Sequence, residues 1–275
     1  MKAQIVKVIN TRFYVSYKNK EYECTTSGKL KHKKIEPLVG DYCIFDEENL
    51  IIEDIVDRKN YLLRPNVANI DQAVILTSVK HPDFSANLLD KFLVICSINK
   101  IEPIICISKW DLLDNKNKKE YKSIINYYKK LGIKVLFNTN KFRIKRLFKG
   151  KVTVFTGQSG AGKSTLLNRL NKELNFEVGD ISLALGRGKH TTRYNTLVDL
   201  YGGKVLDTPG FSSIDLNEFS DEDIKLSFRE FLDYKCLYKD CKHINEKDCE
   251  VKKAVDKNLI LKSRYDNYVK FIEKR

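Results

Sequence analysis

The sequence predicts an α/β protein in which a small β-barrel precedes a central α/β domain and a helical, cysteine-rich module follows it. Three observations support this prediction. Short runs of β-forming residues fill the first segment, apolar strands alternate with amphipathic helices through the middle, and three cysteines and a histidine gather near the end. We therefore expect domains at residues 1–62, 63–220 and 221–275.

Length and composition are those of a globular protein. The 275 residues suffice for one good-sized core with small domains attached, and 42% of them are hydrophobic. The excess of 50 Lys and Arg over 36 Asp and Glu gives a net charge of +14. This charge favours a polyanionic partner bound in a salt-dependent way, with a lysine-rich solvated surface as the alternative.

The sequence predicts a cytoplasmic, monomeric protein without a membrane partner. No stretch approaches the roughly 18 apolar residues of a membrane span, and the first residues alternate like a strand rather than a signal peptide. Seven cysteines, an odd number, argue against a closed disulfide framework and fit a reducing compartment.

The first segment predicts a β-barrel of the OB type, because five short strands follow one another between turns. These are Gln4–Ile9, Phe13–Tyr17, Glu21–Thr25, Asp41–Phe45 and Leu50–Val56. A loop at Lys29–Lys34 carries several cations, and Tyr14, Tyr17 and Tyr22 are candidate stacking platforms for RNA bases. A solvated loop and ordinary strand aromatics are the alternative.

The middle segment predicts a largely parallel sheet, because its strands are continuously apolar and separated by helices. The strands are Ala73–Thr77, Pro103–Ser108, Val135–Phe137 and Val152–Phe155, and the helices are Leu88–Ser97 and Tyr121–Leu131. Ser220 precedes Asp221-Glu222-Asp223 and is a candidate N-cap for the helical tail.

A phosphate-binding loop follows the strand Val152–Phe155 and leads into the helical run Thr165–Leu170. Its glycines allow consecutive backbone N–H groups to converge on phosphate oxygens, and the helix N-terminus adds positive potential. Lys163 would neutralise the β- and γ-phosphates, and Ser164 would bind Mg²⁺. The predicted nucleotide-binding residues here are Gly157, Gln158, Ser159, Gly160, Ala161, Gly162, Lys163, Ser164 and Thr165.

Two further motifs complete a GTP site. The apolar strand at Val205-Leu206 ends in Asp207-Thr-Pro-Gly210, a DxxG element whose Asp207 would hold the Mg²⁺ shell. The strand Pro103–Ser108 ends in an xKxD motif that consists of Ser108, Lys109, Trp110 and Asp111. A carboxylate there accepts hydrogen bonds from guanine N1–H and N2–H, which adenine lacks, so the predicted nucleotide is GTP or GDP.

The order of these motifs is permuted, because xKxD precedes the P-loop instead of following DxxG. With this order the chain resembles the RsgA (YjeQ) family of circularly permuted GTPases over nearly its whole length. The resemblance includes Val39–Asp41, Arg64–Asp71, Gly186–Thr192 and Asp207–Phe211. It implies a circularly permuted P-loop GTPase domain that hydrolyses GTP, binds the small ribosomal subunit and its rRNA, and times late subunit maturation and its own release.

Hydrolysis requires a group that orients the attacking water. The position after DxxG, often Gln in GTPases, is Phe211, which has no polar atom. His190, in the glycine-flanked switch segment, is the catalytic candidate, since an imidazole can orient water near neutral pH. Contact with phosphate or RNA is its alternative role. Of the two adjacent switch threonines, Thr192 is the one expected to join Ser164 and Asp207 around Mg²⁺, with Thr191 as the alternative.

The late cluster predicts one structural zinc ion. Cys236, Cys241, His243 and Cys249 form a closed Cys₃His set, which suits tetrahedral Zn²⁺ without an open catalytic position. This spacing also matches the zinc module of the family. The remaining cysteines lie in apolar patterns and are expected to fill cores: Cys24, Cys43, Cys96 and Cys106.

Two other functions remain open at the level of sequence. An RNA-binding assembly factor with a structural or weakly active nucleotide site is favoured by Phe211 and by Ser108, which replaces the usual Asn of the motif. A P-loop ATPase or kinase is disfavoured by Asp111. Nucleotide competition and turnover assays with small subunits separate the three.

Overall fold

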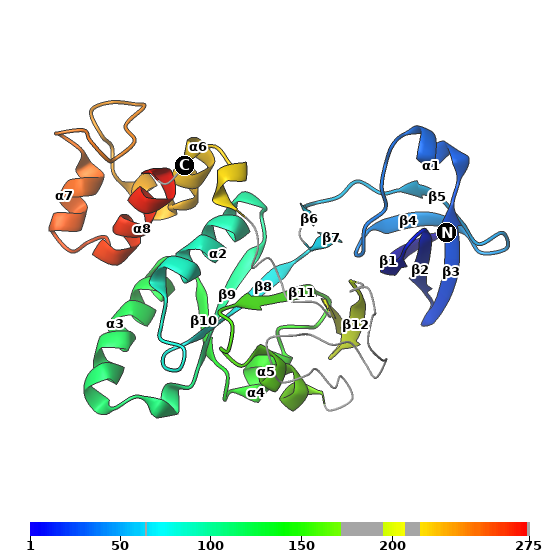
Figure 1. Ribbon diagram of the computed structural model, residues 1–275, viewed down its shortest axis with the longest axis horizontal. Helices are drawn as coiled ribbons and strands as arrows, with labels where there is room; N and C mark the ends of the chain where they lie inside the picture. The colour runs from blue at the N-terminus through cyan, green and yellow to red at the C-terminus, as the bar shows by residue number, and fades with distance from the viewer. Residues whose placement is uncertain (64, 172–194, 207–214, 274–275) are drawn as a thin grey trace. The chain divides into compact units, whose positions relative to one another are not determined.

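A computed structural model describes residues 1–63, 65–171, 195–206 and 215–273 (Figure 1). The chain divides into two compact units. The first consists of Met1–Val74, Asn140–Thr156 and Gly162–Ser212, and the second of Ile75–Thr139, Gly157–Ala161 and Ser213–Arg275.

The first unit contains a closed five-stranded barrel with the strand order β1-β2-β3-β5-β4. Its strands are β1 (Lys2–Ile9), β2 (Arg12–Tyr17), β3 (Lys20–Thr26), β4 (Tyr42–Asp46) and β5 (Ile51–Ile55). Only β3 and β5 pair in parallel. Ile5, Val15, Phe45 and Ile52 are fully buried inside. The predicted OB-type barrel is confirmed.

Two details of the barrel differ from expectation. The expected loop contains a short helix, α1 (Gly28–His32), because the Ser27 hydroxyl accepts a hydrogen bond from the Leu30 amide and Leu30 is buried. Tyr17 and Tyr22 both pack against Phe45, with ring centroids 5.6 Å away. These two rings therefore belong largely to the barrel wall. Two of the expected stacking tyrosines face a cation: Lys7 lies 4.9 Å from the Tyr14 ring centroid and Lys18 lies 5.1 Å from that of Tyr17.

A six-stranded sheet has the order β10-β9-β8-β11-β13-β12. Its strands are β8 (Gln72–Ser78), β9 (Glu102–Ser108), β10 (Lys134–Phe137), β11 (Val152–Gly157), β12 (Leu197–Leu200) and β13 (Gly203–Leu206). The pairs β9/β10 and β11/β13 are parallel, and β12 is an antiparallel edge strand. Every residue of β8 and β11 is buried, which explains their largely apolar sequences.

Several elements were not predicted from the sequence. They include β12 and the two-stranded sheet of β6 (Tyr61–Leu63) and β7 (Asn66–Ala68).

The helices of the middle segment are α2 (Ala86–Ile98), α3 (Asn115–Lys130), α4 (Lys141–Lys145) and α5 (Lys163–Leu170). Helix α3 begins earlier than expected because the Asp114 carboxylate accepts from the Asn117 amide and caps it.

The C-terminal segment of the second unit is helical, as predicted. It contains α6 (Asp221–Ser227), the short 3₁₀ helix η4 (Arg229–Asp233), α7 (Glu250–Asp256) and α8 (Lys262–Glu273). Ser220 caps α6 in a reciprocal capping box with Asp223. Helices α6 and α8 pack against α2 (Figure 1). No described helix is both long and apolar enough to cross a membrane.

A buried charge network joins α8 to α2 and η4, all within the second unit. The Arg264 guanidinium donates to Asp90 Oδ1 at 2.6 Å and to both carboxylate oxygens of Glu230. Asp90 also accepts from the Tyr128 hydroxyl at 2.8 Å and from Asn267 Nδ2 at 2.7 Å. Burial raises the pKa of Asp90, and the charge of Arg264 opposes that rise. The ion pairs, together with the hydrogen bonds from Tyr128 and Asn267, thus compensate the burial of the ions.

Candidate nucleotide site and cysteine cluster

The phosphate-binding loop connects β11 to α5, as its sequence predicts. Gly157 has φ +135°, and a Cβ there would lie 2.0 Å from the Leu76 carbonyl oxygen of β8. Only glycine permits this approach of the two backbones. Gly162 has φ +93° and caps α5, so the helix begins at Lys163 and its N-terminus, the end whose dipole favours an anion, directly follows the phosphate loop.

The xKxD motif lies at the end of β9 and bonds directly to this loop. The buried Ser108 hydroxyl donates to the Ala161 carbonyl oxygen at 2.7 Å, across 53 residues of sequence. Lys109 Nζ donates to the Gly160 carbonyl oxygen at 2.9 Å. Ser108 therefore supplies a hydrogen bond to the phosphate loop, and the replacement of the usual Asn leaves the motif connected to the P-loop.

The backbone of Lys109 turns the chain so that Trp110 and Asp111 enter a short 3₁₀ helix, η1 (Trp110–Leu112). Lys109 has φ 58°, in the left-handed region. The Trp110 ring packs against Phe137 at the end of β10, with centroids 5.2 Å apart. Asp111 is exposed, so its carboxylate is accessible to a ligand.

The loop between β8 and α2 is a part of the site that the sequence did not predict. Lys109 Nζ also donates to the His81 carbonyl oxygen, and Gln158 Nε2 donates to the Asp83 carbonyl oxygen at 2.9 Å. These acceptors are backbone groups, which every residue type carries, so no sequence pattern marks them. The loop holds both the xKxD lysine and the phosphate loop.

Other predicted site residues stand apart from these contacts. Ser164 and Thr165 lie half-buried in the first turn of α5, beside Lys163. His190, Thr192, Asp207, Gly210 and Phe211 lie outside the described residues. The structure thus brings together the phosphate loop and the base-recognition motif.

The predicted metal ligands form a compact cluster in the second unit. One ligand atom from each of Cys236, Cys241, His243 and Cys249 lies within 4.8 Å of the others. His243 Nδ1 is 3.5, 3.3 and 3.3 Å from the three sulfur atoms in sequence order. Burial raises the pKa of Cys241, and a bound cation would oppose that rise by favouring the thiolate.

Surrounding aromatic residues hold the backbone of the cluster. Tyr265 donates its hydroxyl to the His243 carbonyl oxygen at 2.7 Å, and Tyr268 donates to the Lys242 carbonyl oxygen at 2.6 Å. The Phe231 ring meets the His243 ring edge-on at 5.6 Å. The donor set and its packing fit a tetrahedral metal centre.

This fold and these contacts define a P-loop GTPase in which the base-recognition motif precedes the phosphate loop, that is, a circularly permuted GTPase. Residues 55–217 match the family model described as RsgA GTPase, and residues 2–50 match the RsgA N-terminal domain. The chain belongs to the RsgA GTPase family.

Relatives of similar length support this membership. The chain is 41% identical over 283 residues to a protein of Clostridium beijerinckii, with 99% of this chain and 97% of that protein covered. It is 42% identical over 280 residues to a protein of Enterococcus faecalis, covering 99% and 94%. Both are named small ribosomal subunit biogenesis GTPase RsgA.

Solved structures agree with the sequence relatives. YloQ, titled a circularly permuted GTPase, superposes with a TM-score of 0.84 at 34% identity, covering 99% of this chain and 94% of that one. YjeQ from Thermotoga maritima superposes with a TM-score of 0.85 at 33% identity, covering 99% and 97%. The predicted family, fold class and GTPase activity are confirmed.

Proposed function

We propose that this chain binds the small ribosomal subunit and hydrolyses GTP to time late subunit maturation and its own release. The observation that carries the proposal is the pair of bonds from Ser108 and Lys109 to the phosphate loop, in a chain whose relatives bear the name of subunit biogenesis GTPases. This role implies the cytoplasm. It also fits a monomer, because one chain supplies both the phosphate loop and the base-recognition motif.

In this proposal the xKxD motif recognises guanine. The accessible Asp111 carboxylate accepts from guanine N1–H and N2–H. Lys109 fixes the strand end against the phosphate loop, and Trp110 supports the turn through Phe137. The phosphates bind along residues 157–165, where Lys163 balances their charge and the first amides of α5 donate.

Mg²⁺ would be held by Ser164, Thr192 and Asp207 together with the phosphate oxygens, and it supplies charge neutralisation at the γ-phosphate. His190 is our candidate for orienting the attacking water, because Phe211 has no polar group for that task. Structural Zn²⁺ fits the Cys₃His cluster, and its binding free energy would stabilise a segment with a small core.

We propose three functional segments with boundaries at residues 62 and 220. The barrel and the cysteine module would contact rRNA, in agreement with the net charge of +14, and the central segment would bind nucleotide. On the barrel, Lys2 lies 5.3 Å from the centroid of the exposed Tyr42 ring, a cation and aromatic pair suited to nucleic acid.

GTP turnover titrated with purified small subunits over a salt series tests this function. We expect saturable stimulation by subunits, loss of the stimulation at high salt, and competition by GDP but not by ATP. Turnover that subunits leave unchanged, with nucleotide binding intact, would favour an RNA-binding assembly factor with a structural nucleotide site. Competition by ATP as strong as that by GDP would contradict guanine recognition by Asp111.

The role of His190 has its own test. Under single-turnover conditions with saturating subunits, His190→Ala should lower the rate by about 10²-fold or more while GTP affinity is retained. His32→Ala removes an exposed imidazole from α1 and should leave the rate unchanged, so it is the matched control. An unchanged rate for His190→Ala would reject the catalytic role.

A further inference from the structure

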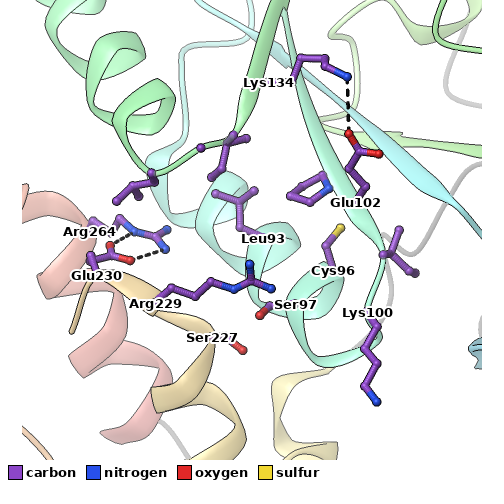
Figure 2. A pocket seen from close by; sticks show the side chains of 15 residues that line it. Leu93, Cys96, Ser97, Lys100, Glu102, Lys134, Ser227, Arg229, Glu230 and Arg264 are labelled. Carbon is purple, nitrogen blue, oxygen red and sulfur yellow. Dashed lines mark hydrogen bonds and ion pairs between the residues drawn. The ribbon is translucent and has the colours of Figure 1, made fainter. Parts of the chain in front are cut away.

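The second unit contains a cavity of about 440 Å³ whose lining includes none of the predicted nucleotide-binding residues (Figure 2). We call it the α2–η4 cavity. Its volume falls in the range of roughly 300–1,000 Å³ that is usual for small-molecule sites. Its lining comes from α2, the start of β9, the turn between α3 and β10, and from α6, η4 and α8.

The cavity is separate from the nucleotide site. It contacts β9 at the first residues of the strand, Glu102 and Pro103, whereas the base-recognition motif begins at the last residue, Ser108. Six residue steps along a strand, at about 3.3 Å each, put roughly 20 Å between these positions. A nucleotide bound by the P-loop and Asp111 therefore leaves the α2–η4 cavity free.

The charges around the cavity favour an anion. Four basic side chains line it against two acidic ones, and each acid is already paired with a base. Glu102 lies 3.5 Å from Lys134, and Glu230 binds Arg264. Arg264 is also paired with the buried Asp90 behind the lining, so the four bases face three acids and one net positive charge remains to attract a ligand.

Arg229 is the side chain best suited to bind such a ligand. It is exposed at the start of η4 and makes no hydrogen bond or ion pair with any other described residue. Its guanidinium points toward Ser97 on α2, across the cavity (Figure 2). A planar guanidinium with its donors uncommitted matches a carboxylate or phosphate group, with the Ser97 hydroxyl as a second donor.

The remaining wall is apolar and comes from several elements. Leu93 on α2, Ile101 and Pro103 at the start of β9, and Leu131 and Ile133 between α3 and β10 supply hydrocarbon surface. Burial of a ligand's apolar body against this surface removes it from water, which favours binding. The lining thus combines a polar end at Arg229 with an apolar interior.

We propose that the α2–η4 cavity is a second ligand site, which takes a small organic anion with an apolar body, such as an aromatic carboxylate or phosphate monoester. The anionic group binds Arg229 and Ser97, and the apolar body lies against Leu93, Ile133 and their neighbours. Because the lining comes both from α2, β9 and β10 and from α6, η4 and α8, an occupant joins the cysteine module to the GTPase half of this unit.

The test uses the full-length protein saturated with zinc, Mg²⁺ and GDP, so that the probes cannot enter the nucleotide site. Benzoate and phenyl phosphate are titrated by ligand-observed NMR, with benzyl alcohol as the neutral analogue. We expect saturable binding of at least one anion with a Kd of about 1 mM or tighter, and at least about tenfold weaker binding of benzyl alcohol. Comparison of the two anions distinguishes a carboxylate site from a phosphate site.

Variants assign the binding to this cavity. Arg229→Gln should weaken the anion about tenfold or more, and Ser97→Phe should abolish binding by filling the space. Lys235→Gln removes an exposed cation from the same module outside the cavity and should leave binding unchanged. The proposal is overturned if neither anion saturates below about 10 mM, if benzyl alcohol binds as tightly, or if Arg229→Gln and Lys235→Gln have equal effects.

Discussion

Removing the buried guanidinium of Arg264 should destabilise the junction between α8 and α2 far more than removing an ordinary surface charge. The side chain of Arg264 is 3% exposed, and those of its partners Asp90 and Glu230 are 0% and 7% exposed. Arg264→Met keeps most of the volume but leaves two buried carboxylates without their cation. Breaking a buried pair in this way costs about 3–5 kcal/mol.

The pH dependence provides a second measure of the same effect. Burial already raises the pKa of Asp90, and the loss of Arg264 raises it further. A carboxyl whose pKa is raised on folding contributes stability below its unfolded pKa and loses that contribution as pH rises through its folded pKa. The difference between wild type and Arg264→Met should therefore be largest near neutral pH and should narrow as the pH falls and Asp90 becomes protonated.

Urea unfolding followed by circular dichroism, with hydrogen exchange of the α2 and α8 amides, measures the loss. Lys262→Met is the matched control, because it removes a cation from the same helix. The ion pair between Lys262 and Asp266 is exposed and should contribute about 0–1 kcal/mol. Replacing all three charges, with Asp90→Asn and Glu230→Gln added, should recover most of the stability. The reasoning fails if Arg264→Met unfolds no more easily than Lys262→Met.

Three further predictions concern the site. Ser108→Ala leaves a P-loop carbonyl without its donor and should weaken GDP binding by about 1–2 kcal/mol in a fluorescent-nucleotide titration; unchanged affinity would contradict the role of that bond. Gly157→Ala drives a Cβ into the backbone of β8 and should abolish nucleotide binding, whereas Gly28→Ala, with open space around it, should not. Cys241→Ser should reduce the zinc content from about one ion per chain toward zero, and Cys24→Ala should keep it; equal zinc in both variants would reject the cluster.

The regular elements were predictable where burial imposes a simple pattern. Strands β8 and β11 are buried along their whole length, and both are rich in apolar residues, such as the run Ala73–Leu76 of β8. The first turns of α3 are polar and exposed, so they lack the apolar periodicity on which the prediction was based. The predicted helix therefore starts at Tyr121, whereas α3 begins at Asn115. The capping role of Ser220 was predictable because the cap chemistry is local in sequence.

Long-range contacts were less accessible to sequence reasoning. The motifs identified Ser108 and Lys109, but the carbonyl groups that they bind carry no residue signature. Asp90 and Arg264 are separated by 174 residues in the sequence. Arginine side chains usually lie at the protein surface, so nothing in the sequence marks Arg264 as buried. Only the folded chain shows that Arg264 is buried against an acid on α2.

Helix α2 connects features that were described separately. Its N-cap, Ser85, comes two residues after Asp83, whose carbonyl binds the P-loop side chain of Gln158, and Asp90 on its second turn binds Arg264 of α8. A hydrogen-bonded helix of 13 residues, about 20 Å long, transmits displacement along its axis without stretching. The same helix therefore contacts the loop that bonds to Gln158 at one end and the helix that carries Arg264 along its length, so a displacement of α2 would reach both the phosphate loop and the cysteine module.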